Sequence, residues 1–347
     1  MRAIRGKAGK KLMALLLSLL MLPGLLPIKA VAEEKAQKEE IQKVRGAVLT
    51  EVDDSFAEDK WRLIFNYPQF FHRLTYQDEK TGLYLHYSLY FPEKYNPEET
   101  YPLVVFIADE STTGNDLELP VAQGRGAVVW AAEEWQEVFP CIVAVPLYRE
   151  RVLDNTLYTT TNYVSLTGSW VKSLCAEYPI DGTRIYGTGQ GMGCEILMVL
   201  ASRNPKLFAA SMFVSGQWDA KRLRGLEKQK FILFAAEEDT PVRKFSNDLM
   251  AIFDTDGVGY AHTEWDGTWT PSQLSTAGVT LTTSSTGHYF VAWKRGTIIP
   301  DSDLMHRLGT NGTRRDAIHR ASFDEAYRCV AIMEWMFAQT TAEAENQ

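Results

Sequence analysis

The sequence is poor in the residues that build metal centres and disulfide networks. It has four cysteines and six histidines, with no Cys-x-x-Cys pair and no His-x-x-x-His pair, so metal catalysis has no support in the sequence. The cysteines follow no regular spacing: Cys141 lies in an apolar run typical of a strand, and Cys194 and Cys329 lie in helix-like segments. We therefore predict buried free thiols, no metal site and no cofactor.

Long apolar runs are confined to the N-terminus. Lysines and arginines there precede an apolar run over residues 12–26, and Ala30-Val31-Ala32 offers a small-x-small cleavage site. Residues 1–32 are therefore predicted to be a signal peptide. The run is shorter than the ~20 residues that a membrane-spanning helix needs, and Pro23 interrupts it. We expect a secreted or extracytoplasmic protein with no membrane span after cleavage.

The predicted mature chain, which begins at Glu33, is acidic. Removing residues 1–32 takes six of the 36 Lys and Arg residues and none of the 44 Asp and Glu residues, which leaves a net charge of −14. That charge disfavours nucleic acids and anionic membranes as partners. Residues 33–69 predict a charged tether and N-terminal segment. Residues 70–347 predict a single domain, whose oligomeric state the sequence does not disclose.

Within that domain, short apolar runs alternate with amphipathic helices, which is typical of a mostly parallel sheet covered by helices on both faces. Alternating aromatic and polar residues from Phe70 to Pro92 predict antiparallel edge strands that precede it. The apolar runs that predict strands are 103–107, 142–145, 185–189, 209–214 and 231–235. The segments that predict helices are 161–178, 192–204, 245–253 and 323–339.

The turn between the strand that ends at Gly189 and the helix that begins near Met192 is typical of a nucleophile elbow. Small residues at 189 and 193 let strand and helix approach closely, and the central residue, here Gly191, points above the sheet. A dinucleotide-binding loop would follow the first strand of a domain, with an acidic residue about 20 positions later. Here several strands precede the turn, and residue 211 is a serine within an apolar run.

The elbow and its surroundings resemble exported bacterial α/β-hydrolases related to feruloyl esterases and polyhydroxybutyrate-depolymerase-like esterases, whose elbow usually reads Gly-Gln-Ser-Met-Gly. The resemblance covers roughly residues 70–340 and implies the α/β-hydrolase fold. It rests on the segments 101–107, 126–130, 181–186, 204–210, 217–219 and 319–323, with Ala326-Tyr327 and Trp335. The departure lies at the nucleophile position, where Gly191 stands in place of the serine.

The same resemblance implies the partners of the missing nucleophile. Asp239 is the acid, at the end of the Glu237-Glu238-Asp239 cluster that follows a strand. His319 is the base, just before the last predicted helix, and the order 191, 239, 319 is that of nucleophile, acid and base in this fold. His288, which opens an aromatic run, and His306, in a polar loop, are the competing histidines.

Two backbone N–H groups are predicted to form the oxyanion hole. Met192 supplies the first, and Glu110, in the Ala108–Ser111 turn, is predicted to supply the second. Many relatives have a His-Gly-type sequence in that turn, so the Asp109-Glu110 pair is a second departure, and an acid facing an oxyanion would oppose it.

Tryptophans are candidate walls of a substrate pocket. Trp218, together with Gln217, directly follows an apolar run and is the best substrate-binding candidate. Trp135 is a further candidate. Trp130 is one too, but it ends an apolar run, and packing in the core explains it at least as well as a place in the pocket wall.

Gly191 has no hydroxyl to deprotonate, so no acyl-enzyme can form there. The resemblance implies a hydrolase of small-molecule or polysaccharide-linked carboxylic esters whose activity is strongly impaired. A non-catalytic ligand-binding protein that keeps the pocket is the alternative. A prolyl-oligopeptidase-like serine peptidase is a lesser one, because no propeller-like domain is predicted. A Ser-to-Gly change confined to this copy, natural or engineered, would leave the rest of the site intact.

Overall fold

The computed structural model describes residues 52–299 and 313–342, all within one compact unit, residues 50–347. The predicted signal peptide and His306 lie outside the described residues. No helix in the described ranges is long and apolar enough to cross a membrane.

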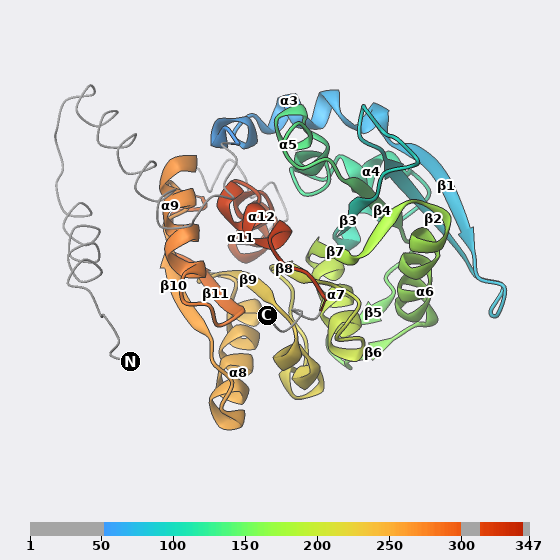
Figure 1. Cartoon of the computed structure of the whole chain (residues 1–347). Helices are drawn as coiled ribbons and strands as arrows, with labels where there is room; N and C mark the ends of the chain where they lie inside the picture. The colour runs from blue at the N-terminus through green and yellow to red at the C-terminus, as the bar shows by residue number, and fades with distance from the viewer. Residues whose placement is uncertain (1–51, 300–312, 343–347) are drawn as a thin grey trace, which may run out of the picture. The chain divides into compact units, whose positions relative to one another are not determined.

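A nine-stranded sheet forms the centre of this unit, in the order β1-β2-β4-β3-β7-β8-β9-β11-β10 (Figure 1). β1 and β2 pair with each other in antiparallel fashion, β2 pairs antiparallel with β4, and all other neighbours are parallel. The strands are β1 (His72–Gln77), β2 (Tyr84–Tyr90), β3 (Tyr101–Ile107), β4 (Ile142–Leu147), β7 (Ile180–Gln190), β8 (Ala210–Val214), β9 (Phe231–Ala236), β10 (Ala261–Trp265) and β11 (His288–Trp293). A separate two-stranded sheet pairs β5 (Leu153–Asp154) with β6 (Thr159–Thr160).

The inner strands are apolar along their whole length because both faces of the sheet are covered. Every residue of β3, β4, β8 and β9 is buried, as is typical of parallel strands between two layers of helices. β1 lies at the edge, and its residues are exposed or half-buried. The sheet therefore agrees in type with the prediction.

Helices cover the two faces of the sheet. Leu103, Val105 and Ile107 of β3 face one core, shared with α6, α7 and α8. Phe106 faces the other way, and its ring lies 6.1 Å from that of Tyr327, which directly follows α11. The longer helices are α6 (Asn162–Glu177), α7 (Met192–Arg203), α8 (Thr240–Asp256), α9 (Pro271–Thr282), α11 (Arg314–Ala326) and α12 (Val330–Phe337).

Short helices and 3-10 turns fill the connections. Residues 52–69, which we assigned to the segment before the domain, form helical turns that bury Phe56 and Leu63 in the same unit. The short elements are η1 (Asp54–Ala57), α3 (Lys60–Asn66), η2 (Pro68–Phe70), η3 (Glu110–Thr112), α4 (Glu118–Val121), η4 (Val128–Ala131), α5 (Glu133–Gln136) and η5 (Ala220–Lys228).

The C-terminal helices differ from the prediction in one way that matters for the site. The single helix predicted over 323–339 is two helices, α11 and α12, and His319 lies inside α11 instead of before a helix. A second difference is that β10 and β11 extend the sheet where no strand was predicted.

All four cysteines are free, as predicted, and Cys141, Cys194 and Cys329 are buried.

Candidate functional site

The connection between β7 and α7 has the geometry of a sharp strand-to-helix turn. Gly191 lies between Gln190, the last residue of β7, and Met192, the first of α7, with φ 53° and ψ −123°. Few residues other than glycine adopt such a positive φ. A Cβ on Gly193 would lie only 2.0 Å from the carbonyl oxygen of Ile107. Glycine at 193 is therefore required for α7 to lie against the end of β3.

The space above Gly191, where the side chain of a nucleophile would stand, is filled by Asp109. A Cβ built on Gly191 would lie 2.2 Å from Oδ2 of Asp109 and 2.9 Å from its Cγ. The same Oδ2 lies 3.5 Å from the backbone nitrogen of Met192, the predicted oxyanion donor. The carboxylate of Asp109 thus occupies the volume of the missing side chain and faces the N–H that would stabilise an oxyanion.

Local hydrogen bonds hold Asp109 in this position. Its Oδ1 accepts a hydrogen bond from Ser111 N (3.0 Å) and so caps η3. Its backbone N–H donates to Oε1 of Gln123 (2.7 Å), and that same oxygen accepts from Nε2 of Gln190 (2.8 Å). The turn after β3 is therefore connected to the elbow through Gln123, and the Asp109 side chain is almost completely buried.

The predicted acid and base are in direct contact. Asp239, in the turn after β9, is 2% exposed, and its Oδ2 bonds Nδ1 of His319 at 2.6 Å. Carboxylate contact through Nδ1 fixes the orientation of the ring and leaves Nε2 as the nitrogen that can take a proton. The other two acids of the cluster pair elsewhere: Glu237 with Arg243 at 2.6 Å and Glu238 with Arg314 at 2.5 Å.

Burial and nearby carboxylates act in opposite directions on His319. Burial lowers the pKa of its imidazole, but the hydrogen bond that its Nδ1–H donates to Asp239 and the negative charges of Asp239, Asp109 and Glu195 raise it. The net result is a pKa above the ordinary value of 6.5. The imidazolium form is therefore stabilised, which suits a group that must accept a proton during a reaction.

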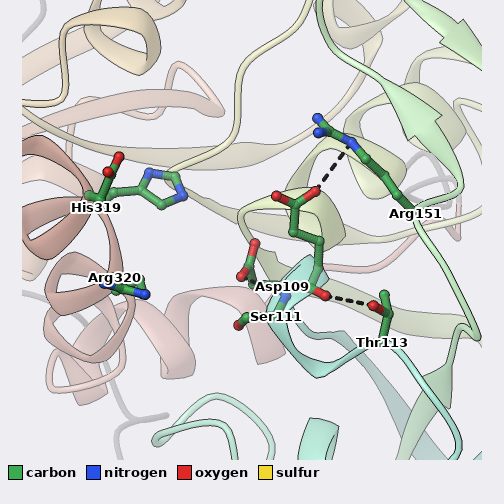
Figure 2. A pocket seen from close by; sticks show the side chains of 8 residues that line it. Asp109, Ser111, Thr113, Arg151, His319 and Arg320 are labelled. Atoms are coloured by element: carbon green, nitrogen blue, oxygen red, sulfur yellow. Dashed lines mark hydrogen bonds and ion pairs between the residues drawn. The ribbon is translucent and has the colours of Figure 1, made fainter. Parts of the chain in front are cut away.

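His319 and Asp109 both line a cavity of about 470 Å³ at the carboxyl end of the sheet. Figure 2 shows His319 and Arg320 entering it from α11, on the side opposite Arg151. All of its lining residues are polar or charged: Asp109, Glu110, Ser111, Thr113, Arg151, Asp316, His319 and Arg320. A ligand of this cavity would therefore meet charged groups of both signs.

Glu110, the predicted second oxyanion donor, lines the cavity too, but its side chain does not face the Met192 N–H. Its carboxylate pairs with Nε of Arg151 at 3.2 Å, and its backbone oxygen accepts from Thr113 Oγ1 at 2.9 Å (Figure 2). The acid that faces the predicted oxyanion hole is thus Asp109, its neighbour.

One charged residue near the site was missed from the sequence. Glu195, in the first turn of α7, is 3% exposed. Its Oε1 accepts from Asn155 Nδ2 (2.7 Å) and Gln217 N (3.4 Å), whereas its buried Oε2 has no hydrogen-bond partner. Burial raises the pKa of this carboxyl to about 7. The sequence did carry a signal for it, because Glu195 is the lone acid in the apolar run that follows the elbow.

The predicted substrate-binding pair lies outside the cavity lining. Trp218 is buried in the core with its ring 5.5 Å from that of Tyr158, and Gln217 contacts Glu195 through its backbone. Trp130 and Trp135 are fully buried against each other. His288 has a structural environment: its Nδ1 bonds the carbonyl oxygen of Gly259 at 2.9 Å, and its ring packs on Phe231.

Comparison with known proteins places this architecture among solved esterases. No protein-family model matches the sequence, and no curated protein matches it. A thermostable esterase structure is similar with 26% identity and a TM-score of 0.59, over 79% of this chain and 64% of the esterase. This chain therefore spans less than two thirds of that esterase's length.

Two further solved structures align at lower similarity. A feruloyl esterase module from Clostridium thermocellum, complexed with sinapinate, aligns with 11% identity and a TM-score of 0.49, over 82% of this chain and 94% of the module. A fluorophosphonate-binding serine hydrolase from Staphylococcus aureus aligns with 11% identity and a TM-score of 0.48, over 78% and 98% of the two chains. The chain has the α/β-hydrolase fold.

Proposed function

We propose that this chain is an exported protein of the ester-hydrolase type in which serine-based hydrolysis of carboxylic esters is strongly impaired. Export rests on the predicted signal peptide over residues 1–32. The hydrolase type rests on the elbow between β7 and α7, on the Asp239–His319 hydrogen bond of 2.6 Å, and on the similarity to a thermostable esterase.

The impairment rests on one observation: the nucleophile position has no hydroxyl, and a carboxylate fills its place. Gly191 cannot form an acyl-enzyme. Oδ2 of Asp109 also faces the Met192 N–H at 3.5 Å, so an ester carbonyl would have to displace or approach a negative charge. Both effects oppose the formation of a tetrahedral oxyanion at this site.

Restoring the serine alone should therefore give little activity, because the Asp109 carboxylate would first have to move. Gly191→Ser would bring a Cβ to 2.2 Å from Asp109 Oδ2 and would place a non-glycine residue at φ 53°, a conformation that costs about 1–3 kcal/mol. Asp109→Ala removes the colliding atoms. We expect the double variant Gly191→Ser/Asp109→Ala to hydrolyse p-nitrophenyl acetate at least about tenfold faster than either single variant, because a serine nucleophile contributes on the order of 10⁶ in comparable triads.

The assay compares the full chain, the two single variants and the double variant on p-nitrophenyl acetate, with labelling by a fluorophosphonate as a second measurement. The double variant should label and the parent should not. Efficient hydrolysis together with labelling by the parent would refute the placement of the nucleophile. A folded double variant that neither hydrolyses nor labels would instead favour a protein that only binds its ligand.

A further inference from the structure

The carboxylate above the elbow can itself act as a nucleophile, and it lies beside the position that the side chain of a nucleophilic serine would take. Three observations place it there. Its Oδ2 fills the volume beside the α-carbon of Gly191. Asp109 and His319 line the same cavity, and the charge of Asp109 contributes to the raised pKa of His319. Carboxylates act as covalent nucleophiles in other enzyme classes.

We propose that Asp109 is a covalent nucleophile that acts with His319 and Asp239 in the hydrolysis of small polar molecules that carry a leaving group on a saturated carbon. The proposal goes beyond the loss of serine chemistry proposed above, since it assigns the cavity a different reaction and a different class of substrate.

The chemistry of a carboxylate decides the substrate class. Attack on a carboxylic ester would have to expel an alkoxide to leave an acid anhydride, which is less stable than the ester. Attack on a saturated carbon instead gives an ordinary aspartyl ester, which a water molecule activated by an imidazole can hydrolyse. The arrangement therefore fits an alkyl halide better than the acyl esters of serine hydrolases.

In the first step, one carboxylate oxygen of Asp109 forms a bond to the saturated carbon, and the halide leaves with the electrons of the broken carbon–halogen bond. The cavity also supplies a cation for the departing anion, because Arg320 is one of its lining residues. The carboxylate oxygen that does not attack keeps a backbone N–H beside it, that of Ser111 at 3.0 Å or that of Met192 at 3.5 Å.

In the second step, Nε2 of His319 takes a proton from water, and the hydroxide adds to the carbonyl carbon of the aspartyl ester. The oxyanion forms on the Asp109 oxygen that did not attack, next to the backbone N–H of Ser111 or of Met192 that lies beside that oxygen. Collapse breaks the bond between that carbon and the product oxygen, which receives the proton from His319. The carboxylic acid of Asp109 then loses its proton to solvent. Alkyl halide and water thus yield alcohol, halide and a proton, and one oxygen of Asp109 comes from water.

The cleanest test uses this exchange of oxygen. The full chain is incubated with 2-bromoethanol in ¹⁸O-labelled water, bromide release is followed by ion chromatography, and the peptide that contains residue 109 is examined by mass spectrometry. We expect bromide release and ¹⁸O in Asp109 after repeated turnover. His319→Gln should stop at the first step and accumulate a hydroxyethyl ester on Asp109, because its base is missing.

Asp109→Asn keeps a side chain that can cap η3, since asparagine caps helices about as well as aspartate, so loss of bromide release in this variant reports the carboxylate and not the fold. The matched control is Asp59→Asn, the same change at another capping aspartate. Asp59 does not line the cavity, and its Oδ1 accepts a hydrogen bond of 2.9 Å from Arg62 N. The control should release bromide as the parent does.

Absence of bromide release by the parent, or release without ¹⁸O in Asp109, overturns the nucleophile. Either result is separate from the fluorophosphonate and p-nitrophenyl acetate experiments, which test only the loss of serine chemistry.

Discussion

The carboxyl group of Glu195 allows the electrostatics of the site to be tested through stability. Its ordinary pKa of 4.5 is raised to about 7, mainly by burial, while Asn155 and Gln217 oppose the rise through hydrogen bonds. The folded protein therefore holds this proton more tightly than the unfolded chain does. Between pH 4.5 and 7 the folded state binds more protons, so its stability must fall as the pH rises through this window.

The size of the effect follows from the two pKa values. A pKa difference of one corresponds to about 1.4 kcal/mol. A rise from 4.5 to about 7 therefore corresponds to about 3 kcal/mol of folding free energy. This stability is fully present below pH 4.5 and is lost as the pH rises through 7. The neighbouring Arg151 reduces the cost of the ionised form, and Glu110 increases it.

Glu195→Gln removes the titration while keeping the shape. The amide oxygen can still accept from Asn155 Nδ2, and the NH₂ group takes the place of Oε2, which has no partner. An unpaired buried donor costs about 1–3 kcal/mol, but this cost does not depend on pH. The informative quantity is therefore how the stability difference between the parent and Glu195→Gln changes with pH, since other titrating groups cancel in that difference.

The measurement is urea unfolding of both proteins between pH 4.5 and 8, followed by tryptophan fluorescence. The unfolding free energy of the parent should fall by about 3 kcal/mol relative to Glu195→Gln over this range. Glu118→Gln, at an exposed glutamate paired with Arg73, serves as the control and should change little. Parallel pH curves for the parent and Glu195→Gln would refute the buried, proton-binding state of this carboxyl.

Three further predictions concern the site and its supports. Asp109→Asn should lower the pKa of His319, because it removes one of the negative charges that stabilise the imidazolium; an NMR titration that gives the ring the same pKa in parent and variant would contradict this electrostatic coupling. Gly193→Ala should destabilise the fold by about 3 kcal/mol or more, as its Cβ meets the Ile107 carbonyl oxygen at 2.0 Å, whereas Gly182→Ala, with open space around it, should leave the melting temperature nearly unchanged. Arg328→Met should cost about 3–5 kcal/mol, because the buried guanidinium binds Glu58, Glu325 and two carbonyl oxygens; equal urea midpoints for this variant and for Arg73→Met would show that the network contributes nothing.

The sequence was sufficient to predict the structural features that repeat along the chain or that depend on backbone geometry alone. Continuous apolar runs predicted the inner parallel strands, and glycines 189 and 193 predicted a close strand-to-helix turn, which the structure has. β10 and β11 were missed for opposite reasons. The first four residues of β10 alternate between half-buried and exposed at the sheet edge, and only Trp265 is buried. β11 is an aromatic run that could equally have packed outside a sheet.

The side chains around the elbow could not be ordered from sequence, because neighbouring residues in a turn point in different directions. Asp109 and Glu110 are adjacent acids. The capping bond from Ser111 N holds the Asp109 carboxylate near Met192, and the ion pair with Arg151 holds that of Glu110 elsewhere. Trp218 follows a strand end, as a pocket residue would, but the loop over residues 151–158 brings Tyr158 against it. Both outcomes depend on contacts between segments far apart in the chain.

The two departures from the esterase pattern, Gly191 in place of serine and the acid at Asp109, depend on each other physically. A side chain at 191 and the present position of the Asp109 carboxylate exclude each other, since the two groups would overlap at 2.2 Å. A serine could return only if Asp109 left the Met192 N–H or gave up its cap on η3. A restored serine therefore has to be tested together with a change at Asp109, because the two side chains would share one volume.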